Sequence, residues 1–587
     1  MSVIKPENWE PAGKIELEDA ASQAVRLDHN CTITAGPGAG KTELLAQRAC
    51  YLLQTNACHT PQRILAISFK NDAAANLKER VRARCGMELS SRFLSLTYDA
   101  FAKALLDRFI LALPPPLAIN PDYELVFENR LQDIGPIGHR RLNFKWINRL
   151  AVTILETNPK LLKALRLSYS HVFLDEFQDT TDIQYNLIKV CFYGSNSILT
   201  AVGDEKQRIM VWAGALSNAF ERFTSDFNAT RLELVMNHRS APKLIALQMA
   251  MYKSLNANPT SIIPDKKWDA DAGAATLLIC ENDNQEAEEI ASDIARQITE
   301  LKIPPREICL LYRQRPDIYA LKIINALKLR GIKARVESIF QDLIKDPLSD
   351  LIVRFLHSSL DPSDTHEREL LLAIFAEIKM INTDQSNPAY DRFIIDLQNK
   401  FAQTREWIRN PRSPKLAAKF VRRLVENVIG LDRIKALFPI YKQSTYLTRQ
   451  IDSLASAIQA EFDNGCPDWM SAIKSFLGVD SIPIMTIHKS KGLEFKSIYF
   501  IGIDDESFRN FTNNPEEDRC AFFVALSRAK ENVTFSFSEK RNDMLRHHDA
   551  VNEFFQLLQS DSNVNIKDLR VKSASPQVDP STNSATQ

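Results

Sequence analysis

The chain has 587 residues, of which 45% are hydrophobic and 25% are charged, and its 73 Lys and Arg residues balance 73 Asp and Glu residues. This is the composition of a soluble globular protein with enough residues for about three to five domains, and a net charge of zero excludes a histone-like protein that coats nucleic acid by charge alone. The sequence contains no apolar run of about 18 residues and begins with a mostly polar segment, so we expect a cytoplasmic protein without a membrane span or a secretory signal.

Cysteine and glycine usage narrows the class of protein further. The nine cysteines are scattered and never form a CxxC pair, so we expect buried thiols of a reducing compartment rather than zinc, iron–sulfur or disulfide ligands. Glycine accounts for only 17 residues, against about 40 at average usage. A local cluster of glycines is therefore expected to serve a specific backbone function.

Short apolar and β-branched runs alternate with helical patterns in two parts of the chain, which predicts an α/β fold with two parallel sheets. The expected strands are residues 31–35, 63–69, 172–175 and 198–202 in the first part, and 275–280, 307–312, 482–486, 497–503 and 533–537 in the second. The stretches at about 106–168 and 347–478 have helical spacing and are expected to be helical insertions. From about Ser573 the chain is rich in Ser, Thr, Pro, Asn and Gln, which predicts a disordered tail.

The first expected strand runs directly into a cluster of glycines, and a helical pattern follows it. Small residues allow consecutive backbone N–H groups to surround phosphates, and a helix N-terminus adds positive potential. In this pattern Lys41 reaches the β- and γ-phosphates and Thr42 binds Mg²⁺. The first position of the usual GxxxxGK[ST] pattern is Ala rather than Gly. The predicted nucleotide-binding residues are Ala35, Gly36, Pro37, Gly38, Ala39, Gly40, Lys41 and Thr42.

A pair of acids ends the expected strand at 172–175. Asp175 is predicted to hold Mg²⁺ through water, and Glu176 to orient and deprotonate the attacking water. An acidic exit from a strand is common by itself, but here a phosphate loop precedes it in the chain.

Five further segments occur in the order of known helicase motifs. They are residues 64–74, 199–215, 231–240, 485–495 and 517–529, which are similar to motifs Ia, III, IV, V and VI. With the phosphate loop and the acid pair, the region from about 20 to 538 resembles the UvrD/Rep/PcrA family of superfamily 1 helicases.

The resemblance implies two RecA-like P-loop NTPase domains, each with an α-helical insertion subdomain, and ATP in the cleft between them. We therefore expect the first domain at 1–105 and 169–250, the second at 251–346 and 479–560, insertions at 106–168 and 347–478, and a disordered tail at 561–587. ATP and Mg²⁺ are the implied cofactors.

The resemblance also assigns roles at the nucleotide. It implies that Arg239 and Arg528 are arginine fingers, that Gln207 contacts the γ-phosphate and that Glu494 lies near the ribose. Gln23 is the best counterpart of the adenine-reading glutamine, although its spacing differs. Glu43 and His238 replace the family's usual Arg and Tyr, so strict preference for ATP stays open.

For the nucleic-acid strand, the resemblance implies base platforms and backbone contacts. The expected platforms are Phe69, Tyr98 and Trp212, and the expected backbone contacts are Asn71, Thr97, Thr486 and His488. Departures from the family at this side are Asp99, Met210 and Ala213. Further cationic candidates are Arg80, Arg82, Arg84, Arg140, Arg141, Lys145, Lys415, Lys419, Arg422 and Arg423.

These features predict an ATP-dependent DNA helicase or translocase that moves 3′-to-5′ on single-stranded DNA and acts on tailed duplexes, in DNA repair, recombination or phage defence. The alternative is an ATP-dependent sensor or loading subunit of a nuclease complex that does not unwind processively. Action on RNA also stays open, and no nuclease motif is recognisable, so DNA cutting would need a nuclease partner protein.

Overall fold

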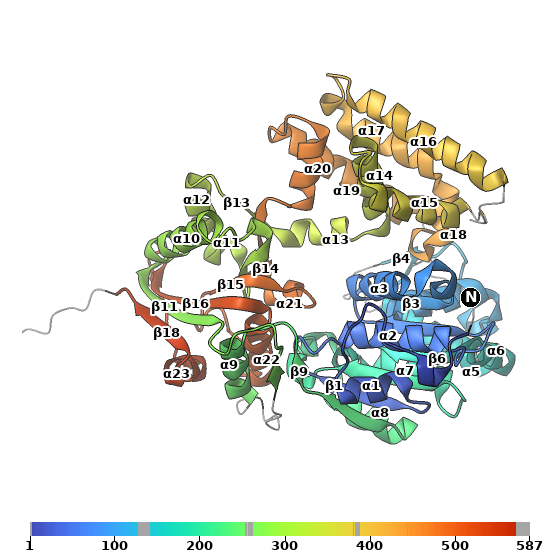
Figure 1. Ribbon diagram of the computed structural model, residues 1–587, viewed down its shortest axis with the longest axis horizontal. Coiled ribbons are helices and arrows are strands. Elements are labelled where there is room, and N and C mark those ends of the chain that lie inside the picture. Colours follow the sequence, from blue (N-terminus) through green and yellow to red (C-terminus); the bar gives the residue numbers. More distant parts are fainter. Residues whose placement is uncertain are drawn as a thin grey trace, which may run out of the picture.

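The computed structural model describes residues 3–126, 141–252, 255, 262–379, 381, 388–442 and 444–570. Two α/β bodies lie side by side, and the helices of residues 347–477 form a third body beyond them (Figure 1). Among the helices of the described ranges, none combines the length and apolar character that a membrane crossing needs.

Six parallel strands form the first sheet, in the order β3-β2-β6-β7-β1-β8. They are β1 (Cys31–Ala35), β2 (Arg63–Ser68), β3 (Phe93–Thr97), β6 (Tyr169–Leu174), β7 (Ile198–Gly203) and β8 (Thr230–Leu234). Because these strands are parallel, β1, β6 and β7 all end at the same edge of the sheet. The sequence analysis missed β3 and β8. Both are edge strands whose residues are mostly half-buried or exposed, so they lack a continuous apolar run.

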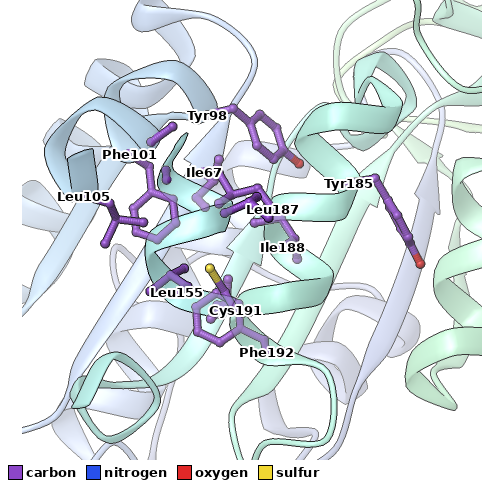
Figure 2. Packing of buried hydrophobic residues seen from close by; sticks show 14 of the residues in the cluster. Ile67, Tyr98, Phe101, Leu105, Leu155, Tyr185, Leu187, Ile188, Cys191 and Phe192 are labelled. Atoms are coloured by element: carbon purple, nitrogen blue, oxygen red, sulfur yellow. The ribbon is translucent and has the colours of Figure 1, made fainter. Parts of the chain in front are cut away.

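Helices cover both faces of the first sheet. They are α1 (Asp19–Arg26), α2 (Lys41–Gln54), α3 (Asn71–Ser90), α4 (Tyr98–Phe109), α5 (Phe144–Thr157), α6 (Pro159–Ser168), α7 (Asp182–Phe192) and α8 (Ala219–Phe227). Leu77 of α3 packs on one face with Ile33. On the other face, Phe101 and Leu155 share a cluster with Ile67 (Figure 2). The helices of the first predicted insertion thus share the core of the sheet.

The second sheet has the strand order β13-β14-β12-β15-β16-β11-β18, and β17 pairs antiparallel with β16. Its strands are β11 (Ala274–Asn282), β12 (Ile308–Tyr312), β13 (Lys333–Val336), β14 (Ser481–Thr486), β15 (Phe495–Ile501), β16 (Ala529–Arg541), β17 (Met544–Leu545) and β18 (Val564–Asp568). On one face lie α10 (Asp283–Thr299) and α12 (Leu321–Leu329), and on the other lie α22 (Pro515–Leu526) and α23 (Asn552–Ser560).

The prediction of a disordered tail over 561–587 is wrong for its first part. β18 pairs in parallel with β11, from Val564 opposite Ala275 to Asp568 opposite Ile279. Its side chains are mostly exposed, so no apolar pattern marks the strand, and the open edge of β11 provides its hydrogen bonds. Residues 571–587 lie outside the described residues.

The predicted boundary of the first domain at residue 250 is also wrong. Helix α9 (Pro242–Tyr252) begins before that boundary and crosses it, yet its residues Leu244, Leu247 and Met251 all pack in the same core as Phe535 of β16. The chain therefore crosses between the two domains before α9. Sequence periodicity identifies an apolar helix but does not say which sheet the helix covers.

The second insertion has a core of its own. Its helices are α14 (Pro347–Leu360), α15 (Thr365–Lys379), α16 (Pro388–Ile408), α17 (Ala417–Leu424), α18 (Leu431–Leu437), α19 (Ser444–Asp463) and α20 (Trp469–Leu477). Phe355, Phe401 and Trp469 are buried in a cluster whose buried members, among the described residues, all lie between Leu348 and Phe476. At the start of this body, Arg354 of α14 pairs with Glu79 of α3 in the first domain at 3.6 Å, and Lys345, which precedes α14, pairs with Asp72.

Candidate functional site

The phosphate loop lies between β1, which ends at Ala35, and α2, which begins at Lys41. Gly38 and Gly40 have φ angles of +73° and +79°, a region that favours glycine. A Cβ atom at Gly38 would lie 2.5 Å from Asn237 Oδ1 and 2.6 Å from Arg239 Cβ. The loop therefore requires glycine at this position both for its backbone and for the close approach of the chain at 237–239.

Lys41 points back into this loop. Its Nζ donates hydrogen bonds to the carbonyl oxygens of Ala35 and Gly36, at 3.0 and 3.1 Å. Burial lowers the pKa of Lys41, and Arg239 and Arg528 lower it further, although the nearby carboxylates act in the opposite direction. The ammonium group thus lies inside the loop, close enough to Arg239 and Arg528 for their charges to act on it.

The acid pair directly follows β6, which lies two strands from β1 in the sheet. Asp175 N donates to Ile67 O at 2.9 Å, which continues the ladder with β2. Glu176 adopts a left-handed φ of 50°, and its Oε2 accepts a 2.6 Å hydrogen bond from Gln178 Nε2. Burial and the charge of Glu176 raise the pKa of Asp175. Burial alone would raise the pKa of Glu176 too, but the charges of Lys491 and Lys41 hold it below the ordinary value.

Arg528 reaches the first domain from the start of β16. It is buried, and its Nη2 donates to Gln207 Oε1 at 2.7 Å, while Gln207 Nε2 donates to Asp204 Oδ2 at 2.7 Å. Burial, and then the charge of Arg239, lower the pKa of Arg528 to about 9. The predicted γ-phosphate glutamine and the predicted arginine finger are therefore in direct contact.

Arg239 lies beside Arg528, and a carboxylate holds it. Its Nε donates to Glu494 Oε2 at 2.7 Å, and its Nη1 donates to Ser527 O at 3.0 Å. Glu494 also pairs with Lys530 at 3.3 Å. Although burial acts in the opposite direction, Arg239 and Lys530 lower the pKa of Glu494. Glu494 therefore forms an ion pair with Arg239, a role that the sequence analysis did not assign.

The sequence analysis also left Lys491 without a role. This buried lysine of the second domain lies 2.5 Å from Asp179 Oδ2 and 3.8 Å from Glu176 Oε2, and it donates to Gln207 O at 3.0 Å. It thus connects the acid pair with the glutamine of motif III. Its place inside the motif V segment was the only signal in the sequence.

A magnesium nucleotide fits the charges of this site. Burial, together with the proximity of cationic groups, lowers the pKa values of Lys41 and Arg528, so a bound polyphosphate would stabilise their charged forms. In the described residues, no group of three or more His, Cys, Asp or Glu side chains could hold a metal by itself. Mg²⁺ commonly uses one or two protein ligands together with phosphate oxygens, which suits Asp175 and Thr42.

On the base side of the nucleotide site, Gln23 is exposed on α1. Glu43 instead connects α2 with α3, because its carboxylate accepts hydrogen bonds from Arg80 and Arg84 at 3.0 Å each. His238 N donates to Gly38 O at 2.9 Å, and His238 Nδ1 lies 2.8 Å from Asp265 Oδ2. A histidine held by a carboxylate thus borders the phosphate loop.

The predicted base platforms differ in their exposure. Trp212 is 66% exposed, whereas Phe69 is half-buried. Tyr98 is only 1% exposed, and its hydroxyl lies 3.1 Å from Thr180 Oγ1. The prediction that Tyr98 stacks on a base is wrong, because its ring belongs to the core between the sheet and α7 (Figure 2).

The predicted backbone contacts lie mainly at helix starts. Asn71 is exposed at the first position of α3, and Thr97 accepts a hydrogen bond from Ala100 N as the N-cap of α4. Thr486 similarly caps α21 (Ile487–Ser490). His488 Nε2 lies 3.1 Å from Ile209 O, so its ring contacts the other domain.

Many of the cationic candidates have acidic partners. Arg80 and Arg84 pair with Glu43, Arg141 pairs with Glu124 at 3.4 Å, and Arg422 pairs with Asp452 at 2.8 Å. These pairs reduce the charge available to a strand. Of the remaining described candidates, Lys145, Lys415, Lys419 and Arg423 are exposed and Arg82 is half-buried, and Arg140 lies outside the described residues.

Comparisons with known proteins agree with this geometry. The UvrD-like helicase C-terminal domain matches residues 232–540, and the UvrD/REP helicase N-terminal domain matches residues 17–134 and 125–228. The chain is 22% identical to DNA helicase II of Escherichia coli, over 89% of this chain and 85% of that protein. It is also 22% identical to the ATP-dependent DNA helicase Rep of Escherichia coli, over 90% and 91%. The ATP-dependent DNA helicase PcrA of Leuconostoc citreum is 23% identical, over 85% and 79%.

Proposed function

The chain belongs to the UvrD/Rep-like family of superfamily 1 helicases and is an ATP-dependent DNA helicase, and from this premise we propose that it moves 3′-to-5′ along single-stranded DNA while it hydrolyses ATP. The observation that supports coupling of ATP hydrolysis to movement of the domains is the contact of Arg528 Nη2 with Gln207 Oε1 at 2.7 Å, whereas the 3′-to-5′ polarity is proposed from the family resemblance. This contact joins the nucleotide sides of the two domains at the point where a γ-phosphate would be sensed.

The proposed roles of the residues follow from their positions. Lys41, Arg239 and Arg528 would stabilise the charge of the transferring phosphoryl group, and arginine fingers of this type can contribute about 10³–10⁵ in rate. Glu176, ionised under the influence of Lys491 and Lys41, would orient the attacking water and accept its proton. Thr42 and Asp175 would hold Mg²⁺. When bound, MgATP provides a phosphoanhydride bond and a cation that neutralises charge on its oxygens.

On the strand side, Trp212 and Phe69 are the proposed base platforms, and Asn71, Thr97 and Thr486 are the proposed backbone contacts. Trp212 follows Gln207 closely in the chain, so a change at the nucleotide has a short covalent route to a stacked base. The proposed setting is DNA repair, recombination or phage defence. In each of them a nuclease partner would supply DNA cleavage.

The experiment is ATP hydrolysis by the purified chain with and without single-stranded DNA. We expect strong stimulation by DNA, no turnover in Lys41→Ala, and nucleotide binding without hydrolysis in Glu176→Gln. A duplex with a 3′ single-stranded tail should be separated, and one with a 5′ tail should remain intact.

Other outcomes point to the alternatives. A lack of stimulation by DNA would reject the motor and favour a sensor or loading subunit. Stimulation without strand separation would indicate translocation alone, and stronger stimulation by RNA would identify RNA as the track. Full activity of either variant would reject the assignment of the catalytic residues.

A further inference from the structure

Three consecutive side chains of one short turn contact the second domain. The turn is the 3-10 helix η5 (Glu205–Gln207) and the residue that follows it, and it comes directly after β7 and Asp204 of the first domain. Its side chains at 206, 207 and 208 contact Tyr252, Arg528 and Glu516 respectively. The middle contact belongs to the proposed function, whereas the two flanking contacts need a separate explanation.

Lys206 contacts helix α9 of the second domain. Its Nζ lies 4.7 Å from the centre of the Tyr252 ring and 3.1 Å from Asp204 Oδ1. Tyr252 is buried, and its hydroxyl is the nearest group to a Cβ built on Gly36, at 3.7 Å. Although burial acts in the opposite direction, the charge of Asp204 raises the pKa of Lys206. A charged Lys206 therefore lies between the aspartate that holds Gln207 and an aromatic ring of the other domain.

Arg208 contacts helix α22 of the second domain. Its Nη2 donates to Glu516 Oε1 at 2.5 Å, and the arginine side chain is only 12% exposed. Glu516 lies in the first turn of α22 with Glu517 and Asp518, and the latter two lie close to Arg313. Arg208 thus pairs with Glu516, whereas the other two acids in the first turn of α22 lie close to Arg313. In addition, η5 packs against α22.

Ile209, the residue after Arg208, adds an apolar contact with the second domain. Ile209 is fully buried in the hydrophobic core of the second domain, together with Leu244 and Met485, although it belongs to the chain of the first domain. Its carbonyl oxygen lies 3.1 Å from His488 Nε2. The backbone beyond it leads to the exposed Trp212. The segment from Lys206 to Ile209 is therefore attached to the second domain by side chains on several sides.

We propose that Lys206 and Arg208 are positioning residues, which dock this turn on α9 and α22 and so hold Gln207 against Arg528. The inference rests on the proposed function, because it concerns how the γ-phosphate glutamine is presented. When the two domains separate, the turn then moves with the second domain, and Met210 and Trp212 move with the turn. The two basic residues thereby couple the cleft to the strand side.

The pair of Arg208 and Glu516 allows a charge-reversal test. The variants are Arg208→Glu, Glu516→Arg and the double reversal, and the matched control is Arg509→Glu, which breaks a surface pair with Glu506 at 2.5 Å. We expect each single reversal to lower DNA-stimulated ATP turnover about 5- to 10-fold, a typical effect for a coupled contact. The double reversal should recover to within about twofold of the wild type, and the control should change less than about twofold.

A second readout does not depend on activity. Hydrogen–deuterium exchange of the backbone at residues 204–213, without nucleotide or DNA, should be about 10-fold faster in each single reversal and slow again in the double reversal. Tyr252→Leu should also accelerate this exchange, whereas Tyr252→Phe, which keeps the ring, should not.

The outcomes separate this inference from the proposed function. If the effects of the two reversals simply add, or if exchange at 204–213 is unchanged in the single variants, the positioning role is rejected. If the wild type shows no stimulation by DNA but exchange responds as expected, the docking is correct and the proposed motor function fails.

Discussion

At the scale of single residues, burial separates side chains that share one sequence interpretation. Tyr98 and Trp212 both occupy motif positions where a base platform is expected, but the first is buried against Thr180 and the second is exposed. Phe101, three residues after Tyr98, belongs to the same core cluster. An aromatic residue close to a strand end can therefore serve the core or the ligand, and only its environment decides.

This difference predicts how the two side chains affect binding of single-stranded DNA. Trp212→Ala should weaken binding by about 1–3 kcal/mol, because one stacking surface is lost. Tyr98→Phe removes only a hydroxyl that contacts Thr180, and it should change the binding free energy by less than about 0.5 kcal/mol. Fluorescence anisotropy of a labelled oligonucleotide at fixed salt measures both effects. Equal losses in the two variants, or no loss in Trp212→Ala, would contradict the assignment of the platform.

At the scale of elements, the helices around the phosphate loop depend on buried polar contacts. Arg48 of α2 is fully buried, and it donates to Val25 O at 3.1 Å and to Leu27 O at 2.9 Å. These carbonyl groups lie at the end of α1, where no further helical N–H group is available. A guanidinium group thus caps α1 from the helix that carries Lys41, and burial lowers the pKa of Arg48.

Replacement of this cap should destabilise the first domain. Arg48→Met keeps much of the buried volume but leaves the carbonyl groups at the end of α1 without their donor, which should cost about 2–4 kcal/mol. Urea unfolding followed by circular dichroism measures the loss. The control is Arg26→Met on the exposed side of α1, where we expect less than about 1 kcal/mol. A loss no larger than that of the control would show that the cap is dispensable.

At the scale of the whole molecule, the zero net charge reflects many local pairs between acids and bases. Arg80 and Arg84 both form ion pairs with Glu43. Lys345 forms an ion pair with Asp72, and Lys489 forms one with Asp342. These cations lie on or near the elements expected to follow the strand, and their charges are partly neutralised within the protein. Stacking should therefore contribute more to strand affinity than contacts with phosphates.

The salt dependence of binding tests this balance. For a single strand, the logarithm of the binding constant falls by about 0.7 per phosphate contact for each tenfold rise in salt. We expect a slope of about −1.4 to −2, which corresponds to about two or three contacts. Binding measured between about 50 and 200 mM salt provides the slope. A slope steeper than about −5 would mean that exposed cations such as Lys415 and Lys419 contact the strand instead.

A large part of the fold and of the nucleotide site could be predicted from local patterns. The strand, glycine cluster and helix around Lys41 are consecutive in the chain, so backbone preferences and apolar periodicity are enough to identify them. Strands β3 and β18 were missed because edge strands need no continuous apolar run. Helix α9 was assigned to the wrong domain because its apolar residues could cover either sheet.

By itself, the sequence determined the phosphate loop, the acid pair and the two α/β halves, since each depends on neighbouring residues. Only the tertiary structure decided that Lys491 bridges Asp179 and Gln207, that Arg528 meets Gln207 across 321 positions of the chain, and that Tyr98 is buried. The physical reason is that burial and charge pairing depend on the distance in space between groups far apart in sequence, which local composition does not encode. Gly38 shows the same distinction. The glycine-rich pattern of the phosphate loop already indicates a position with positive φ, but the close approach of Arg239 to Gly38 is visible only in the folded chain.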